Sequence, residues 1–334
     1  MTRPEIAVLL AYAKNVLYDE LLSSDLPDTP ELQSELLGYF PERMRSLAPE
    51  VLNAHRLRRE IIATCVANDL VNRMGPSFVE DTQTRTDRDA ASAARAYLIT
   101  RDVFDLRSVW HEIEALDNRV PAATQTRLFL AVGSIVDQAV RWFLLSGLPL
   151  DIARRTHQFQ PRVRELAEQV AELLPESELK VSEARRSAYI ENGAPAGLAE
   201  RIVVLNTLST AMDIVQISEE THRDIAEVAR LYFDTGVSFG LLTLRRQARV
   251  MPAATEWEHL AVDALIDDFY TQQREIVCRL VADGINGSGD DLQTWLVQRT
   301  GSRVQGILAV IARTASPDIA MLTVASRRIR ALVA

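Results

Sequence analysis

Residues 49–74, PEVLNAHRLRREIIATCVANDLVNRM, indicate the fold class most clearly. Apolar residues recur there at intervals of three and four, which is the spacing of one face of an α-helix. Gly75 and Pro76 follow, and this pair is typical of a helix end because proline cannot continue a helix. We therefore predict one long helix over 49–74. Its apolar stripe, which Asp69 interrupts, consists of Leu52, Ile61, Ile62, Cys65, Val66 and Leu70.

The same helical period runs through almost the whole chain, and the alternation typical of strands is nearly absent. The sequence therefore predicts an all-α multi-helix bundle domain over 1–334, or two packed helical subdomains divided near 146–151 or 191–197. Two stretches, 76–86 and 236–252, give no clear prediction. The other predicted helices are 4–22, 30–40, 87–102, 105–117, 121–145, 151–174, 178–191, 196–214, 221–235, 253–283, 290–314 and 317–333.

The amino-terminal residues predict a helix that begins almost at once. Thr2 can cap it, Glu5 stands three residues later as a capping box requires, and Pro4 lies in the first turn, where its missing N–H costs little. Chains usually open with a few loose residues instead. Spacing alone does not explain why this chain begins inside a helix.

Composition excludes several classes of protein. The net charge of −9 argues against non-specific nucleic-acid binding, which needs a basic surface. The two cysteines, Cys65 and Cys278, exclude a disulfide-dense secreted scaffold. Charges interrupt every apolar run before about 18 residues, so no leader or spanning helix is expected. We expect a cytoplasmic protein without nucleic-acid or membrane partners.

No catalytic, cofactor or metal motif is found. His111 and Glu112 begin like a zinc-protease helix, but Ala115 stands where the second histidine is required. The glycine-rich segment 283–291 follows a predicted helix rather than a strand and lacks the Lys-Ser/Thr pair of a phosphate-binding loop. We therefore predict no catalytic residue, no bound cofactor and no metal in this segment.

An acidic helix face leaves one enzymatic alternative open. Asp263 and Asp267 are four residues apart, and Asp268 is adjacent. Paired carboxylates on a helix can hold Mg²⁺ against a diphosphate, as in all-helical terpenoid synthases. Such an enzyme also needs a facing acidic cluster and an aromatic cavity, whereas aromatic residues are only 6% here. A solvated acidic face is the simpler interpretation.

Two polar groups in 49–74 are candidate functional residues. Near the end of the predicted helix, the polar side chains are either an internal hydrogen-bonded network or part of a binding site. They are Asn68, Asp69, Asn72 and Arg73. Near its middle, the arginines Arg56, Arg58 and Arg59 are either solvated or candidates for contacts with another domain, because arginine grips carboxylates well.

Several long runs resemble one family. They are TRPEIAVLLAYAKNVLYDELLSSDLPD (2–28), HRLRREIIATCVANDLVNRMGPSF (55–78), ARAYLITRDVFDL (94–106), IEALDNRVPA (113–122) and RIVVLNTLSTAMDIVQIS (201–218). Together they resemble the carboxyl-terminal helical region of the large bacterial NAD-specific glutamate dehydrogenases. The resemblance is dense over the first 150 residues or so and looser beyond.

The resemblance implies that this chain begins inside a helix because it is a domain of a longer polypeptide, and that its own role is non-catalytic. In that family a catalytic module precedes the helical region, binds NAD and oxidatively deaminates L-glutamate to 2-oxoglutarate and ammonia. The family's catalytic lysine and aspartate belong to that module, so no catalytic residue is assigned here. The expected function is assembly, positioning or regulation, with the catalytic module of the same polypeptide as partner in a homo-oligomer. The alternatives are a Mg²⁺-dependent terpenoid-type enzyme and an independent helical scaffold.

Overall fold

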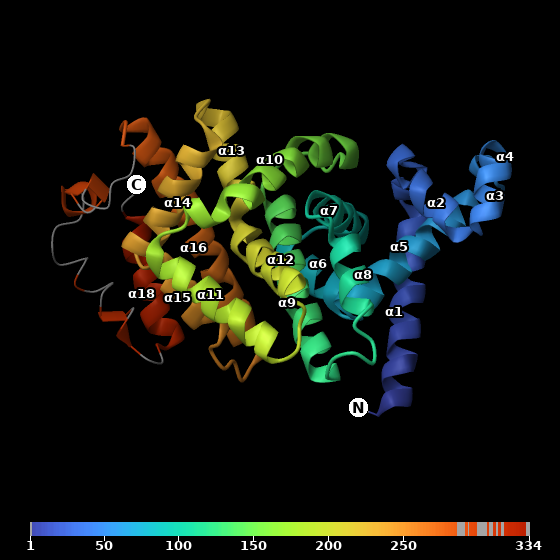
Figure 1. Cartoon of the computed structure of the whole chain (residues 1–334), viewed down its shortest axis with the longest axis horizontal. Coiled ribbons are helices and arrows are strands. Elements are labelled where there is room, and N and C mark those ends of the chain that lie inside the picture. The colour runs from blue at the N-terminus through green and yellow to red at the C-terminus, as the bar shows by residue number, and fades with distance from the viewer. Residues whose placement is uncertain are drawn as a thin grey trace. The chain divides into compact units, whose positions relative to one another are not determined.

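The computed structural model describes residues 2–285, 291–292, 294–298, 306, 310–311, 313–314 and 317–331. Every regular element in these residues is a helix, and no strand occurs among them, so the predicted all-α class is confirmed (Figure 1). The α-helices are α1 Arg3–Ser23, α2 Gln33–Tyr39, α3 Glu42–Leu47, α4 Pro49–Asn53, α5 Arg58–Met74, α6 Phe78–Thr86, α7 Ala90–Val103, α8 Leu106–Glu114, α9 Ala122–Leu145, α10 Ile152–Leu173, α11 Glu176–Glu191, α12 Ala196–Thr207, α13 Ala211–Thr221, α14 Ile225–Ser238, α15 Leu241–Arg249, α16 Glu256–Ala282 and α18 Ile319–Arg330.

The helices form two compact units. Unit 1 contains residues 1–164 and 188–209, and unit 2 contains residues 165–187 and 210–334. The chain therefore passes between the units within α10, within α11 and in the short 3₁₀ helix η3, Leu208–Thr210. A subdomain boundary near 146–151 or 191–197 stays a prediction.

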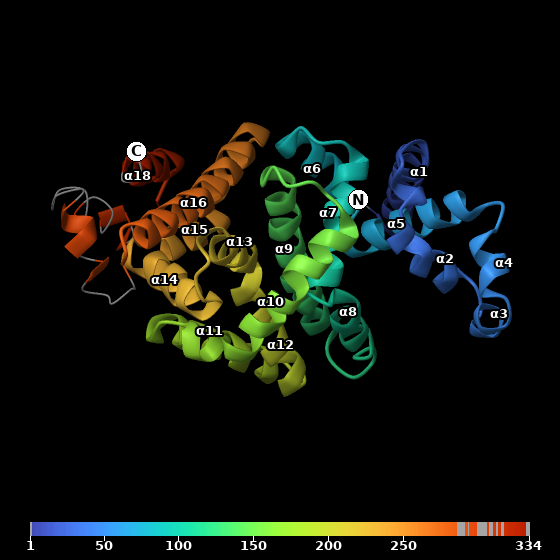
Figure 2. The ribbon, with the colours of Figure 1, turned by 90° about the horizontal axis from the view of Figure 1, so that it is seen from above.

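Unit 1 is built around α5, α7 and α9. Helix α1 packs on α5, α7 packs on α9, and α12 packs on α8 and α9 (Figure 2). Ring contacts extend the core to α10, where Phe159 meets Phe143 edge-on with ring centroids 5.4 Å apart. Leu70, Tyr97 and Phe159 are completely buried. The core therefore lies where the apolar faces of these helices meet, as burial of apolar surface requires.

One helix of unit 1 is apolar enough to cross a membrane by length and composition. It is α9, whose most apolar window has a mean hydropathy of 1.5, and 56% of that window is buried inside the protein. Asp137 and Arg141 form an i,i+4 ion pair on the same helix, with 3.2 Å between Oδ2 and Nη2. A core helix of a globular protein has these same properties.

Unit 2 is built around α16. This helix packs against α13, α14, α15 and α18. Phe269, Ile276 and Val277 of α16 are completely buried. A capping box begins it, because the Glu258 amide donates to Thr255 Oγ1 at 3.2 Å and the Thr255 amide donates to the Glu258 carboxylate at 3.3 Å. Local capping thus starts the helix on which the rest of unit 2 is assembled.

The predicted single helix 49–74 is two helices in the structure. α4 ends at Asn53, residues 54–57 form turns, and α5 begins at Arg58. The His55 side chain accepts a hydrogen bond from the Leu57 amide at 3.2 Å through Nδ1, so a side chain competes locally with the helical ladder. The apolar period continues across the break, which is why periodicity alone did not show it.

Other boundaries differ for similar reasons. The predicted helix 196–214 ends at Thr207, where η3 separates α12 from α13. The left-handed backbone of His222, with φ of 53°, ends α13, and Asp224 then caps α14. Helices α3, α6 and α15 lie where no helix was predicted. Most of the predicted helix 290–314 lies outside the described residues.

Candidate functional site

The predicted polar group on α5 leads to a buried ion network centred on Arg101 of α7. The Arg101 guanidinium is 3% exposed and lies 3.0 Å from the Glu35 carboxylate, 3.3 Å from Asp69 and 2.9 Å from Asp102. Burial alone would lower the pKa of Arg101, but the carboxylates of Asp102, Glu35 and Asp69 raise it above its ordinary value. Arg101 therefore stays charged and joins α2, α5 and α7.

Tyr97 and Arg73 extend this network. The Tyr97 hydroxyl donates to Asp69 Oδ2 at 3.0 Å, and burial together with the Asp69 charge raises the pKa of Tyr97. Arg73 pairs with Glu114 of α8, and its guanidinium carbon lies 4.9 Å from the centre of the Trp110 ring. A cation over an indole ring is a favourable contact. The network thus extends from α2 to α8.

The four polar residues of α5 that were predicted as a network do not all belong to it. Asp69 and Arg73 take part in the network, with 3.8 Å between the Asp69 carboxylate and Arg73 Nε. Asn68 is half-buried and Asn72 is exposed, so Asn72 lies outside the buried part. The central members, Arg101 and Glu35, were missed from the sequence. An available signal was the charged pair Arg101-Asp102 inside the apolar run AYLITRDVF, residues 96–104.

Two of the three predicted contact arginines pair within unit 1. Arg59 forms an ion pair with Asp28 and donates through Nη2 to the carbonyls of Leu22 at 2.8 Å and Ser24 at 2.9 Å. Those carbonyls lie at the end of α1, so Arg59 satisfies acceptors that the helix leaves open. Arg58 lies 3.9 Å from Asp28, and Arg56 is exposed. The three arginines therefore do not act as one cluster.

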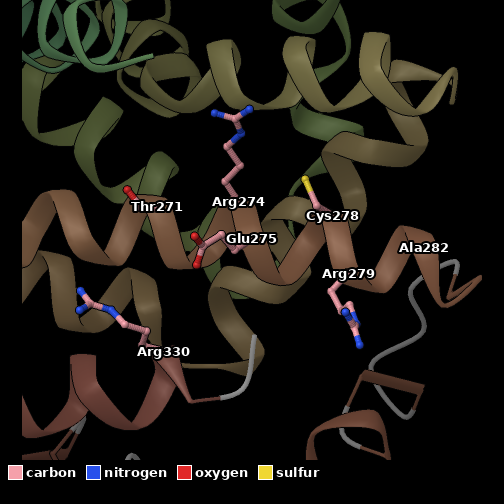
Figure 3. A pocket seen from close by; sticks show the side chains of 7 residues that line it. All are labelled: Thr271, Arg274, Glu275, Cys278, Arg279, Ala282 and Arg330. Carbon is pink, nitrogen blue, oxygen red and sulfur yellow. The ribbon is translucent and has the colours of Figure 1, made fainter. Parts of the chain in front are cut away.

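A groove of about 690 Å³ runs along α16 in unit 2 (Figure 3). Arg274, Arg279 and Arg330 line it, and Arg274 and Arg279 point to opposite sides of α16. Each guanidinium has a carboxylate partner: Glu220 is 3.4 Å from Arg274, Asp283 is 3.9 Å from Arg279, and Asp268 is 2.7 Å from Arg330. These paired and divergent charges are poorly arranged to bind a phosphate or carboxylate.

The three aspartates of the Mg²⁺ alternative lie on α16 outside this groove's lining. Asp268 accepts from Ser326 Oγ at 3.0 Å and pairs with Arg330, so its charge is already balanced by α18. No group of three or more His, Cys, Asp or Glu side chains suited to a metal ion occurs in the part of the chain that the structure describes. This arrangement does not favour the terpenoid-type interpretation.

The two thiols are poor nucleophiles. Burial raises the pKa of the Cys65 thiol to about 11, and repulsion from Glu35 and Asp69 adds to the effect. Burial is also the main cause that raises the pKa of Cys278 in the groove. Because the thiolate is the reactive form, neither cysteine is activated for covalent catalysis.

Comparison with known proteins places the chain in a family. The family described as "Glutamate dehydrogenase, C-terminal" matches residues 1–331. The chain belongs to this family. The resemblance inferred from the sequence runs is thereby confirmed. Every regular element in the described residues of this glutamate dehydrogenase C-terminal segment is a helix.

Three relatives have the same name, "NAD-specific glutamate dehydrogenase". The protein from Pseudomonas aeruginosa is 35% identical over 98% of this glutamate dehydrogenase C-terminal chain, and the one from Halomonas elongata is 33% identical over 90% of it. The Mycobacterium tuberculosis protein is 30% identical over 99%. The chain spans only 21%, 19% and 20% of the lengths of these relatives, respectively.

Proposed function

We propose that this chain is a non-catalytic helical domain of an NAD-dependent glutamate dehydrogenase, which assembles, positions or regulates the catalytic module. The observation that carries the proposal is the family match over 1–331 in a chain that covers about a fifth of its relatives. The complete enzyme converts L-glutamate, NAD and water to 2-oxoglutarate, ammonia and NADH. In this proposal, NAD binds to the catalytic module and not to this segment.

The internal contacts support a structural role. The main charged cluster, around Arg101, is used to hold α2, α5 and α7 together. The arginines of the α16 groove are likewise paired with carboxylates. A site for acid–base catalysis usually contains a group whose pKa is shifted towards neutrality. The pKa values of Tyr97 and of the two thiols are instead raised away from neutrality. Burial raises the pKa values of the Glu20 and Asp234 carboxyls towards neutrality, but neither residue belongs to the Arg101 network or lines the α16 groove.

The partners follow from the same proposal. The catalytic module of the same polypeptide is the first partner, and a homo-oligomer of the full-length protein is the second. We place the protein in the cytoplasm, without nucleic-acid or membrane partners. The acidic net charge of −9 and the partial burial of α9 support these assignments. Arg56 remains a candidate for contact with the catalytic module because it is exposed.

An activity assay with three proteins tests the proposal. They are this chain, the full-length polypeptide and the full-length polypeptide without this segment. We expect glutamate-dependent NADH formation from the full-length protein and none from this chain, and a changed number of subunits by sedimentation or a lowered activity after the deletion. Turnover by this chain above a buffer blank would refute the non-catalytic role. Full activity and an unchanged number of subunits after the deletion would refute the role in assembly or regulation.

A further inference from the structure

The amino-terminal half of α1 has an apolar surface with no covering element in unit 1. None of residues 2–16 is buried, and the first buried residue of the helix is Leu17. In Figure 1 this half of α1 projects past α5, away from the helices on which its other half packs. Its exposed large side chains are Ile6 at 42%, Val8 at 55%, Leu9 at 41%, Tyr12 at 67% and Val16 at 58%.

Four of these five side chains form a second face, whereas Ile6 lies on the side of the helix that packs in unit 1. At about 100° per residue, Val8, Tyr12 and Val16 follow each other up one side of the helix, and Leu9 lies beside them within an arc of about 100°. Leu17 and Leu21, which pack in unit 1, lie on roughly the opposite side. A helix that is apolar on two opposite faces normally has a neighbour on each.

We propose that this face, Val8, Leu9, Tyr12 and Val16, docks in an apolar groove of the remaining part of the same polypeptide. The inference rests on the proposed function, because it takes its partner from the longer relatives. The docking mode is a helix in a groove, with anchors at i, i+4 and i+8. The acidic residues Glu5, Asp19 and Glu20 border the face, so the groove has a basic rim.

The size of the face decides between this partner and a second copy of the chain. Its exposed apolar side chains offer roughly 450 Å² in total. A stable complex of separate molecules usually buries about 800 Å² on each partner. Two such faces packed together fall short of that. A segment joined covalently to its partner needs less area, because linkage supplies an effective concentration in the millimolar range.

Amide hydrogen exchange tests the docking. In this chain alone, the amides of residues 6–16 should exchange much faster than those of α5, because no tertiary contact opposes fraying of an unpacked helix end. In the full-length polypeptide the same amides should exchange at least tenfold more slowly. Equal exchange in the two proteins would overturn the inference. Slow exchange of the same amides in this chain alone, if it disappears on dilution, would also overturn the inference, because it would show that two copies of the chain cover the face.

Matched variants locate the contact. Tyr12→Gln with Val16→Gln keeps good helix formers in α1 but removes two apolar anchors. In the full-length protein, this double variant should make the amides of residues 6–16 exchange as fast as they do in the 334-residue chain alone. Leu130→Gln is the control, because Leu130 is 68% exposed on another helix, α9. It should leave the exchange of α1 unchanged, and equal effects of both changes would contradict the assignment.

The exchange readout separates this inference from the proposed function. If the full-length protein is active and needs this segment but α1 is not protected, the docking face is wrong and the function stands. If the segment proves dispensable but α1 is protected, the docking face stands and the role in assembly or regulation fails. The melting temperature of the short chain with Tyr12→Gln and Val16→Gln should stay within a few degrees of the parent, because neither side chain is buried there.

Discussion

Arg101 is the residue at which α2, α5 and α7 are held together by charge. Its guanidinium contacts Glu35, Asp69 and Asp102, and it is almost completely buried. A buried charge of this kind contributes little net stability compared with an apolar residue of the same shape, but removing it leaves Glu35 and Asp69 with only their outer partners, Arg107 and Arg73. The network therefore specifies how these helices meet.

The first prediction concerns this residue. Arg101→Met should lower the free energy of unfolding by about 1–3 kcal/mol, because Glu35 and Asp69 lose their shared buried cation but keep Arg107 and Arg73 as partners. Urea unfolding of the purified chain measures it. Arg56→Met, at an exposed position, is the control and should change stability by no more than about 0.5 kcal/mol. Similar small losses for both variants would show that the network contributes nothing to stability.

The second prediction concerns the Cys65 thiol, whose pKa is raised to about 11. Its protonated form should persist well above the ordinary thiol pKa of about 8.5, so its alkylation rate should rise about tenfold per pH unit from pH 8 to 10. Iodoacetamide labelling of a Cys278→Ser variant measures this rate. The same protein unfolded in urea is the control, and its rate should level off above pH 9. Levelling near pH 9 in the folded protein would contradict the raised pKa.

At the scale of the element, buried hydrogen bonds and close packing order the helices of unit 2. Tyr232 of α14 donates to Asp213 Oδ2 of α13 at 2.9 Å, and Gln273 of α16 donates to the Tyr232 carbonyl at 2.7 Å. Arg245 of α15 lies over the Tyr270 ring, with 4.1 Å from its guanidinium carbon to the ring centre. Each unit thus has a buried tyrosine that donates to an aspartate on a neighbouring helix.

The third prediction concerns the approach of α14 to α16 at Gly236. A Cβ atom there would lie 2.8 Å from Gln273 Nε2 and 3.0 Å from Leu242 Cγ. Gln273 cannot move away without giving up its buried hydrogen bond to Tyr232. Gly236→Ala should therefore lower the unfolding free energy by about 1–3 kcal/mol, measured by urea unfolding.

Gly133→Ala is the matched control for this prediction. Gly133 lies within α9, and a Cβ atom added there would meet nothing within 4 Å. It should raise stability by about 0.5–1 kcal/mol, because alanine has the higher helix propensity. A gain at both positions would show that α14 and α16 are not closely packed at Gly236.

At the scale of the whole molecule, the extensive apolar cores of both units should make the chain fold without the rest of its polypeptide. We expect a mainly helical far-ultraviolet circular dichroism spectrum and cooperative melting, because packing of apolar faces stabilises helices far more than local propensity does. Thermal melting followed by circular dichroism measures this. A random-coil spectrum, or strong sheet content, would contradict both the fold and its independence.

The fold class, most helix positions and the family were predictable from the amino-acid sequence. These features depend on local spacing and on long characteristic runs, which are visible without knowledge of neighbours. The start of α1 was predictable for the same reason, since its cap uses residues only three positions apart. The Thr2 amide donates to the Glu5 carboxylate at 2.6 Å. The ends of α4 and α12 were not, because side-chain bonding and short 3₁₀ turns interrupt an unbroken apolar period.

The roles of the charged residues, in contrast, depend on contacts between helices that are distant in the sequence. Arg101 and Glu35 are 66 positions apart, so no local pattern relates them, although their side chains lie 3.0 Å apart. Arg58 and Arg59 resembled a docking cluster in the sequence, yet both pair with Asp28 near the end of α1. The uncovered apolar face of α1 also required the structure, because helical spacing shows which residues share a face but not whether another element covers it.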